Sequence, residues 1–181
     1  MLRDIKAGNI LIDSKAHIYI ADLGVCQCIT EIQKDLEKKK LAGTPCWMAP
    51  EVISDHNYTS QSDIWSLGIT AMELFKGVPP LAGFDSEEVL QYIVNGSAPS
   101  LDSYSDAFPT FPSSSFTSWL GGVLKKDPEE RFTIDKVLNH RWFNQAEEGK
   151  GELQELLRSI PDKQVQEDWE LEEVKYVTER E

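Results

Sequence analysis

The chain has 181 residues, which is enough for one domain with a buried core. Its 31 acidic and 18 basic residues give a formal net charge of −13, which argues against a general attraction to nucleic acid or to an anionic membrane surface. No apolar run reaches the roughly 20 residues of a membrane span, and no secretory signal is visible at the start of the chain. Three cysteines are too few for a disulfide scaffold and fit a reducing compartment, so we expect a cytoplasmic protein.

The acidic residues are unevenly distributed along the chain. Residues 145–181 contain 12 acidic and 5 basic residues, so the composition shifts near Asn144. We therefore expect one domain over 1–144 and an acidic, partly helical tail over 145–181.

The first elements combine a short hairpin with a central helix. Two brief apolar runs, 9–12 and 17–21, flank a polar turn and predict a small β-hairpin. Residues 62–76 are apolar on nearly every side, which predicts a helix in the centre of the protein. A capping signal at Ser62 and Asp63 is expected to begin that helix.

Further helices are predicted toward the C-terminus, so the expected fold is mainly α. Residues 85–95 form a helix capped by Asp85, and the Ser- and Pro-rich residues 98–115 form a loop. Gly121 and Gly122 are expected to weaken the helix that follows this loop. Three apolar stripes at helical spacing predict the last helices: Phe116, Trp119, Leu120, Val123 and Leu124; Ile134, Val137, Leu138 and Trp142; Leu153, Leu156, Leu157 and Ile160.

Five motifs then follow one another in a fixed order. They are Leu2-Arg3-Asp4-Ile5-Lys6-Ala7-Gly8-Asn9, Ala21-Asp22-Leu23-Gly24, Gly43-Thr44-Pro45-Cys46-Trp47-Met48-Ala49-Pro50-Glu51, Ser62-Asp63-Ile64-Trp65-Ser66-Leu67-Gly68, and Asp127-Pro128-Glu129-Glu130-Arg131. Over roughly residues 2–143 this order and spacing resembles the C-terminal lobe of a eukaryotic protein kinase. The strings KAGNILI, IADLGV and GTPCWMAPEV are similar to the germinal-centre branch of the Sterile-20-like serine/threonine kinases, above all to its oxidative-stress-responsive and proline-alanine-rich members.

The resemblance implies ATP-dependent phosphoryl transfer to serine and threonine hydroxyls of protein substrates. Asp4 is placed like the base that accepts the substrate proton, and Lys6 like the lysine that neutralises the transferring phosphate. Asn9 and Asp22 are placed like the ligands of Mg²⁺, with Gly24 completing the metal-binding turn. Thr44 would bridge Asp4 and Lys6.

Other motif residues have structural roles in the resembled family. Asp63 would tie the central helix to the backbone of the catalytic loop. Glu51 and Arg131 match a buried ion pair, and Arg3 matches the partner of an activating phosphate. The family's phosphothreonine position holds Lys40 here, and the helix-forming residues 31–40 predict a helix in the activation segment.

Several features of the resembled kinases are not found in this sequence. It contains no Gly-rich phosphate loop and no V-A-I-K-type lysine, which belong to the family's N-terminal lobe. Leu2 stands where the family has His. We therefore expect an incomplete C-terminal lobe with the N-terminal lobe absent, and little or no activity unless a missing N-lobe or a partner kinase complements it.

Two other interpretations stay open. The chain could be a non-catalytic binding or scaffold module that docks partners through the helix at 85–95 and the surface around Thr44, or a truncated gene product. Under the resemblance, the expected partners are protein substrates and an upstream activating kinase. The spacing of Cys26 and Cys28 does not predict a metal site, because no second cysteine pair accompanies them.

Overall fold

The structure is a computed structural model that describes residues 1–26, 43–104 and 112–160. The chain divides into two units. The larger comprises Met1–Leu11 and Tyr19–Asn144, and the smaller comprises Ile12–Ile18 and Gln145–Glu181. Among the described residues, no helix combines the length and the apolar character that crossing a bilayer requires. The helix predicted over 31–40 lies outside the described residues.

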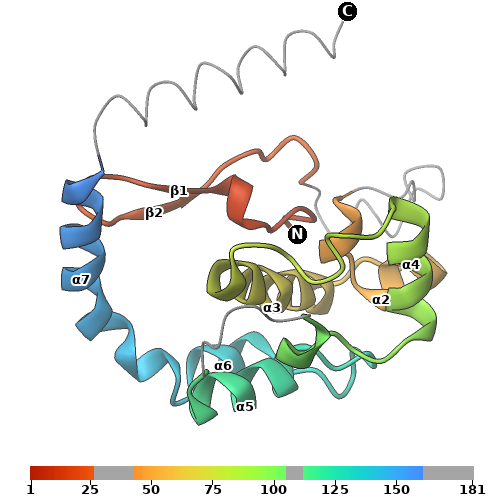
Figure 1. The fold of residues 1–181 in the computed structure, drawn as a ribbon. Helices are drawn as coiled ribbons and strands as arrows, with labels where there is room; N and C mark the ends of the chain where they lie inside the picture. The colour runs from red at the N-terminus through yellow and green to blue at the C-terminus, as the bar shows by residue number, and fades with distance from the viewer. Residues whose placement is uncertain (27–42, 105–111, 161–181) are drawn as a thin grey trace, which may run out of the picture. The chain divides into compact units, whose positions relative to one another are not determined.

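The described chain begins with a short turn and a hairpin (Figure 1). The 3₁₀ turn η1 (Ala7–Asn9) leads into two antiparallel strands, β1 (Ile10–Ile12) and β2 (Ile18–Ile20). The predicted hairpin is therefore confirmed. In its turn, the backbone N–H of His17 donates to Asp13 Oδ1 at 2.8 Å, which lowers the pKa of the Asp13 carboxyl to about 2. The remaining described elements are helices, so the prediction of a mainly α fold with a small hairpin is confirmed.

Helix α3 (Ser60–Lys76) contacts η1, the 3₁₀ turn η3 (Pro45–Trp47) and α5 (Ser114–Val123). Trp65, Ile69 and Met72 on this helix have no exposed surface, as expected for a central helix. The predicted start at Ser62 is wrong. Thr59 is the N-cap, and the Ser62 hydroxyl accepts the Thr59 backbone N–H from the third helical position. The prediction that α3 is apolar on nearly every side is also wrong, because it buries several polar side chains on one face.

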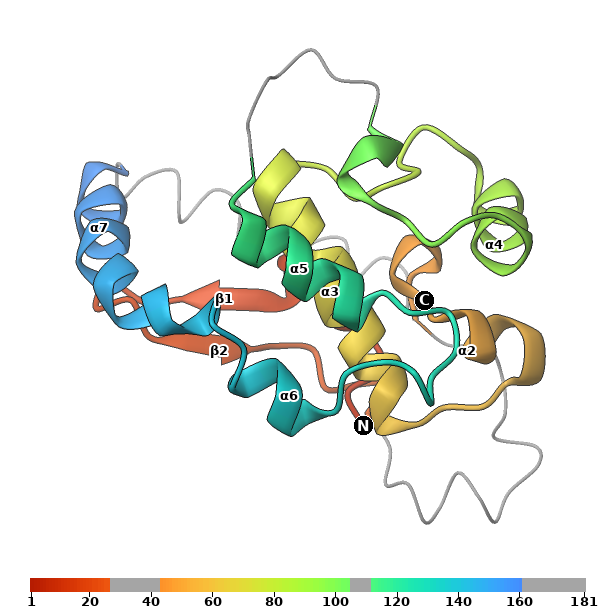
Figure 2. The ribbon, with the colours of Figure 1, turned by 90° about the horizontal axis from the view of Figure 1, so that it is seen from below.

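The other helices of the larger unit pack on α3 or on one another. Figures 1 and 2 show α5 alongside α3 and show α4 (Ser86–Asn95) beside α2 (Pro50–Asp55). Helix α4 begins after its Asp85 cap, so the helix predicted over 85–95 is confirmed. Helix α2 was not expected from the periodicity. Pro50 occupies its first turn, where a missing N–H costs nothing, and His56 ends it in the left-handed region at φ 54°.

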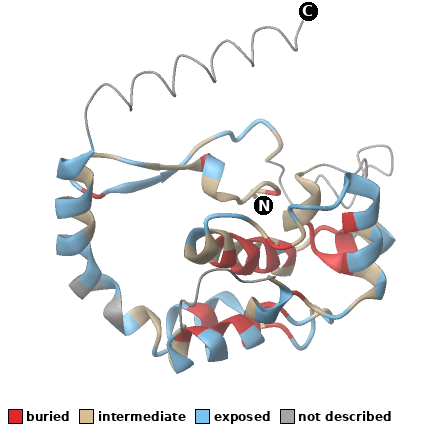
Figure 3. Ribbon diagram, in the orientation of Figure 1, coloured by how far each residue is buried: buried red, intermediate tan, exposed pale blue. Residues whose placement is uncertain are grey.

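Aromatic side chains fill the space between α3, α5 and the end of the larger unit. The ring centroids of Trp119 and Trp142 lie 4.6 Å apart, and those of Phe116 and Trp142 lie 4.8 Å apart. Phe75 on α3 reaches Phe116 at 5.3 Å. Figure 3 shows the buried residues gathered along α3, α5 and the inner faces of α2 and α4. The predicted stripe on α5 therefore faces the core.

Two predictions about the segments around α5 need correction. The predicted loop 98–115 contains the 3₁₀ turn η4 (Leu101–Ser103) and the start of α5, and its residues 105–111 lie outside the described part. Helix α6 (Ile134–Leu138) is shorter than its stripe predicted. Ile134 and Leu138 are 54% and 60% exposed, and only Val137 of the helix faces the core.

The residues of the smaller unit that the structure describes form the hairpin turn and one long helix. Helix α7 (Ala146–Ser159), preceded by the 3₁₀ turn η5 (Phe143–Gln145), matches the last predicted stripe. The Gln154 side chain donates to the backbone carbonyl of Lys15 at 3.0 Å, which fastens α7 to the turn. Leu156 remains 60% exposed.

The two adjacent glycines of α5 have opposite surroundings. A Cβ at Gly122 would overlap the ring of Phe132, whereas a Cβ at Gly121 would meet open space. The propensity cost expected for both glycines is therefore accompanied at Gly122 by a packing requirement that the sequence analysis does not predict. That position allows Phe132 to lie directly against the α5 backbone.

This contrast gives the first prediction. Gly122→Ala should lower the free energy of unfolding by about 1–3 kcal/mol, because the added methyl overpacks the contact with Phe132. Gly121→Ala should raise it by up to about 1 kcal/mol through helix propensity. Urea unfolding of both variants measures the difference, and equal effects would contradict the packing assigned to Gly122.

Candidate active site

Four polar side chains of α3 form one stripe along the helix. Asp63, Ser66, Thr70 and Glu73 are spaced by three, four and three residues, which places them on one face. All four make hydrogen bonds to segments outside α3. We call this set the polar stripe of α3.

The polar stripe holds the N-terminal segment of the chain. The Asp63 carboxylate accepts the backbone N–H groups of Leu2 and Arg3, each at 2.9 Å. Further along the helix, the Thr70 hydroxyl donates to the carbonyl of Ile5 at 3.2 Å. Glu73 Oε2 accepts the N–H of Ala7 at 3.0 Å. Residues 2–7 are therefore fixed at three points to one rigid helix.

The same stripe also holds the turn η3. Glu73 Oε2 accepts the indole N–H of Trp47 at 2.9 Å, and the Ser66 hydroxyl donates to the Trp47 carbonyl at 2.7 Å. Burial raises the pKa of the neighbouring Cys46 thiol, and the negative charge of Glu73 raises it further. Cys46 therefore stays a protonated thiol at neutral pH. Glu73 joins two segments that are 40 residues apart in the sequence at a single carboxylate oxygen.

Three side chains carried by these segments meet in a closed triangle. The Thr44 hydroxyl donates to Asp4 Oδ1 at 2.7 Å. Lys6 Nζ lies 3.1 Å from Asp4 Oδ2 and donates to Thr44 Oγ1 at 3.0 Å. The Asp4 side chain is only 11% exposed, so these contacts fix the orientation of its carboxylate. The structure thus brings together Asp4, Lys6 and Thr44.

Asn9 extends this cluster toward the hairpin. Its amide nitrogen donates to the Asp4 carbonyl at 2.8 Å and to Asp4 Oδ2 at 3.0 Å. These bonds assign the nitrogen end of the amide, so Oδ1 is the end directed away from Asp4. The backbone N–H of Ala21 donates to the Asn9 carbonyl at 2.8 Å, which brings the end of β2 beside Asn9.

Asp22 follows directly after Ala21 in a tight turn. It adopts a left-handed conformation with φ 52°, which Asp tolerates better than most residues. Its Oδ1 accepts the backbone N–H of Gly24 at 3.2 Å. The backbone therefore places Asp22 and Asn9 at neighbouring positions of the same hairpin end.

Arg3 connects the cluster to the segment that precedes η3. It has an unusual φ of 71°, and its guanidinium lies 3.9 Å above the ring of Tyr58. Gly43, at φ 118°, passes so close that a Cβ would lie 2.8 Å from the Arg3 carbonyl oxygen. Only glycine combines this φ with this approach.

The ion pair of Glu51 and Arg131 lies in the interior of the larger unit. Arg131 Nη1 and Nη2 donate to the two carboxylate oxygens at 2.8 and 3.0 Å. Its remaining N–H groups donate to the carbonyls of Gln61, Lys125 and Lys126. The Arg131 side chain has no exposed surface, and all five of its donors have an acceptor. The pair joins α2 to the loop that precedes α6.

Matches to known proteins identify the family of the chain. Residues 1–143 match the model of the family described as the protein kinase domain. The chain belongs to the protein kinase family. It is 39% identical over 159 residues to "Serine/threonine-protein kinase fray2" of Dictyostelium discoideum, and 37% identical over 158 residues to "Serine/threonine-protein kinase fray1" of the same organism.

These alignments cover 88% and 87% of this chain. The chain spans only 15% of the length of the first relative and 27% of the second. The comparisons therefore concern the kinase domain and leave most of the length of both relatives without a counterpart here.

The oxygen donors of this kinase domain suit a hard cation. Within the described residues, no group of three or more His, Cys, Asp and Glu side chains could hold a metal ion. Asn9 Oδ1 accepts no hydrogen bond from the described part of the chain, and Asp22 directly follows Ala21, whose backbone N–H donates to the Asn9 carbonyl. Mg²⁺ typically takes one or two protein oxygens and completes its shell with phosphate and water, so an amide and a single carboxylate fit it.

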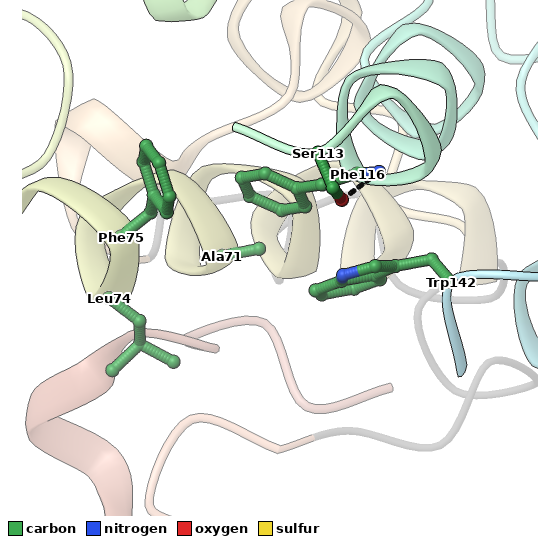
Figure 4. Close-up of a pocket in the computed structure, with 6 residues that line it drawn as sticks. All are labelled: Ala71, Leu74, Phe75, Ser113, Phe116 and Trp142. Atoms are coloured by element: carbon green, nitrogen blue, oxygen red, sulfur yellow. Dashed lines mark hydrogen bonds between the residues drawn. The ribbon is translucent and has the colours of Figure 1, made fainter. Parts of the chain in front are cut away.

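A separate pocket in the kinase domain is lined mainly by apolar side chains. Figure 4 shows the rings of Phe75, Phe116 and Trp142 around a pocket of about 270 Å³ between α3 and α5. Ser113 contributes a hydroxyl, which accepts the N–H of Phe116 at 3.2 Å. No charged side chain lines this pocket, so it offers nothing to hold a phosphate.

Sequence reasoning assigns no role to three of the residues that position the site. Ser66 lies within a motif, and Thr70 and Glu73 lie in the predicted apolar helix, yet with Asp63 all three form the polar stripe. Their spacing at i, i+3, i+7 and i+10 was the available signal, because it marks one face of a helix.

The buried ion pair generates a prediction about stability. Glu51→Gln should lower the free energy of unfolding by about 3–5 kcal/mol, because it leaves the buried Arg131 charge uncompensated. The double variant Glu51→Leu with Arg131→Met removes both charges and should be clearly less destabilised than Glu51→Gln. Urea unfolding measures both, and a double variant as unstable as the single one would contradict this reason.

The two-fold role of Glu73 generates a further prediction. Glu73→Ala removes the acceptor of both the Ala7 N–H and the Trp47 indole N–H, and should cost about 1–3 kcal/mol of unfolding free energy. Glu87→Ala, on the exposed face of α4, is the matched control and should change stability little. Thermal unfolding compares them, and equal melting temperatures would argue against Glu73 as the residue that joins the two segments.

Proposed function

We propose that this kinase domain belongs to a serine/threonine protein kinase that transfers phosphate from ATP to serine and threonine hydroxyls of protein substrates. The observation that carries the proposal is the closed triangle of Asp4, Lys6 and Thr44, with Asp4 Oδ1 2.7 Å from the Thr44 hydroxyl and Asp4 Oδ2 3.1 Å from Lys6 Nζ. It combines a carboxylate, a cation and a hydroxyl on segments that α3 holds rigidly.

In this proposal Asp4 accepts the proton of the substrate hydroxyl. A base of this kind needs a fixed orientation, and three donors supply it: Thr44 at one carboxylate oxygen, Asn9 and Lys6 at the other. Asp4 Oδ1 accepts one bond from Thr44, and its second lone pair could accept the hydroxyl of a substrate. Lys6, at 3.1 Å from Asp4, supplies the positive charge that a transferring phosphoryl group requires.

Asn9 and Asp22 would hold Mg²⁺, with Gly24 shaping the turn that carries Asp22. When bound, the metal with its ATP neutralises charge on the phosphate oxygens. The residues of this chain would fix the position of the metal relative to Asp4. Asn9 is 5% exposed and is fixed by two bonds to Asp4, so a ligand there would lie at a set distance from the proposed base.

The finer assignment is to the germinal-centre branch of the Sterile-20-like kinases. Its support is the set of strings around Asp4, Asp22 and Thr44, together with relatives whose names contain serine/threonine-protein kinase. Under this assignment we propose a cytoplasmic protein with an upstream activating kinase as a partner. We further propose a kinase domain over 1–144 and a separate acidic tail over 145–181.

The remaining motif residues take structural roles in the proposal. Asp63 anchors the backbone of the catalytic loop, and Glu51 with Arg131 fixes the end of the activation segment. Arg3 would face an activating phosphate, although Lys40 stands at the position expected for the phosphorylated threonine.

A phosphotransfer assay tests the proposed base. The protein is expressed at its full natural length and incubated with labelled ATP, Mg²⁺ and a generic basic protein substrate. Asp4→Asn should lower the rate at least about 100-fold while leaving the fold intact by circular dichroism. Label is expected on serine and threonine of the substrate. An Asp4→Asn protein that keeps the parent rate would refute the role of Asp4, and label on tyrosine alone would refute the substrate class.

We also propose that residues 1–181 by themselves have little or no activity, and the same assay on this chain tests that. This sequence contains neither a Gly-rich phosphate loop nor a V-A-I-K-type lysine to hold the nucleotide. These residues alone should therefore show little turnover. Turnover comparable with that of the full-length protein would show that the described site binds ATP without those motifs.

A further inference from the structure

A second pocket of the kinase domain lies between the turn η4 and the C-terminal half of α5 and has a volume of about 440 Å³. This volume falls within the range of about 300–1,000 Å³ that is typical of sites for small ligands. The lining comes from residues 98–102, from Pro112, from α5 and from residues 124–126, all of which the structure describes. The proposed phosphoryl transfer uses none of these residues.

The pocket has apolar walls that belong to the packed interior. Leu120 and Leu124 line it and are each only 5% exposed, and Pro99 of the loop before η4 is buried as well. Gly121 also lines the pocket, and a Cβ added there would meet no heavy atom within 4 Å. The pocket therefore offers space beside the α5 backbone for the apolar body of a ligand.

Hydrogen bonds hold the wall formed by residues 124–126. Lys126 Nζ donates to the carbonyls of Val94 and Gly96 at 2.6 and 2.8 Å, which ties this wall to the end of α4. The backbone carbonyls of Lys125 and Lys126 accept Arg131 Nε and Nη2 at 2.9 and 3.3 Å. A ligand would thus meet a wall that is already positioned.

Two residues of opposite charge line the pocket with their charged groups unused. Within the described residues, the hydrogen bonds of Lys125 and Asp102 run through the backbone, Asp102 donating its N–H to Ser100 Oγ at 3.2 Å. The Lys125 ammonium and the Asp102 carboxylate form no ion pair with each other. The hydroxyl of Thr117, which also lines the pocket, already donates to the Ser113 carbonyl at 3.3 Å.

We infer that this pocket binds a small zwitterion with an apolar body, of about the size of a dipeptide. The ligand's carboxylate pairs with Lys125, its ammonium group pairs with Asp102, and its apolar body lies against Leu120 and Leu124. A ligand of one charge would leave one of the two side chains without a partner, and an uncharged ligand would leave both. The inference goes beyond the proposed function, because this binding requires no phosphoryl transfer.

A titration with a defined probe and its capped forms tests the inference. Leucyl-leucine with free termini is added to the nitrogen-15-labelled 181-residue chain, and the amide chemical shifts of residues 98–102 and 120–126 report binding. Acetyl-leucyl-leucine lacks the positive charge, leucyl-leucinamide lacks the negative charge, and acetyl-leucyl-leucinamide lacks both.

The free dipeptide should bind most tightly of the four probes. Each singly capped probe should bind about threefold or more weakly, which is the loss expected for one partly exposed charge pair, and the doubly capped probe should bind most weakly. Equal affinity of all four probes, or no shift of these amides with the free dipeptide, would overturn the inference.

Charge variants assign each end of the ligand to a side chain. Lys125→Gln should weaken leucyl-leucine about threefold or more but leave leucyl-leucinamide unchanged, because that probe has no carboxylate. Asp102→Asn should likewise weaken leucyl-leucine and leave acetyl-leucyl-leucine unchanged. Lys150→Gln and Asp55→Asn, at exposed positions outside the pocket, are the matched controls and should change no affinity. Equal losses in pocket and control variants would contradict the assigned contacts.

A variant that fills the pocket locates the binding. Gly121→Leu adds a side chain where the structure has open space and also raises helix propensity, so the variant should stay folded by circular dichroism while it loses the dipeptide. Gly151→Leu on α7, where an added Cβ also meets open space, is the control and should bind like the parent. Parent affinity in Gly121→Leu would contradict the placement of the site.

The outcomes separate this inference from the proposed kinase activity. An Asp4→Asn chain should bind leucyl-leucine with the parent affinity, because Asp4 does not line the pocket. Loss of the dipeptide in that variant would contradict the inference, whereas loss of phosphoryl transfer alone would leave it standing.

Discussion

The contact on which the candidate active site depends is the bond of one carboxylate to two backbone amides. Asp63 accepts the N–H groups of both Leu2 and Arg3 at 2.9 Å, from the first turn of α3. A carboxylate that accepts two backbone N–H groups makes charge-assisted bonds that are roughly twice as strong as neutral ones. It also supports the left-handed backbone of Arg3, at φ 71°, which would be strained in a mobile loop.

The rest of the polar stripe continues this anchoring toward Asp4 and Thr44. Thr70 and Glu73 hold the backbone on both sides of Lys6, and Ser66 with Glu73 holds Trp47 of η3. One rigid helix thus holds two segments that are distant in sequence. The side chains of Asp4, Lys6 and Thr44 are therefore already in contact and need to move little. This preorganisation is what electrostatic stabilisation of a phosphoryl group requires, since reorientation at the moment of reaction costs free energy.

The sequence predicted the positions of the helices and the hairpin better than it predicted the tertiary contacts that hold them together. The hairpin and the helix after Asp85 follow from local patterns: alternating apolar residues and a capping aspartate. The periodicity of α3 suggested an apolar core helix, because Ile64, Trp65, Ile69 and Met72 dominate it. Its polar stripe could not be assigned without knowing which loops would reach it. Gly122 shows the same limit. Glycine is required there because the Phe132 ring packs against the α5 backbone, and helix propensity does not predict that contact.

Amide hydrogen exchange of the catalytic segment tests the central role of α3 most directly. If the polar stripe fixes residues 2–7, the backbone N–H groups of Arg3 and Ala7 should exchange much more slowly than those of an exposed loop. Asp63→Ala should accelerate exchange at Arg3, and the core amides of α3 around Ile69 should stay protected. Fast exchange at Arg3 and Ala7 in the parent protein would contradict the account, because it would mean that the segment carrying Asp4 and Lys6 is not held by α3.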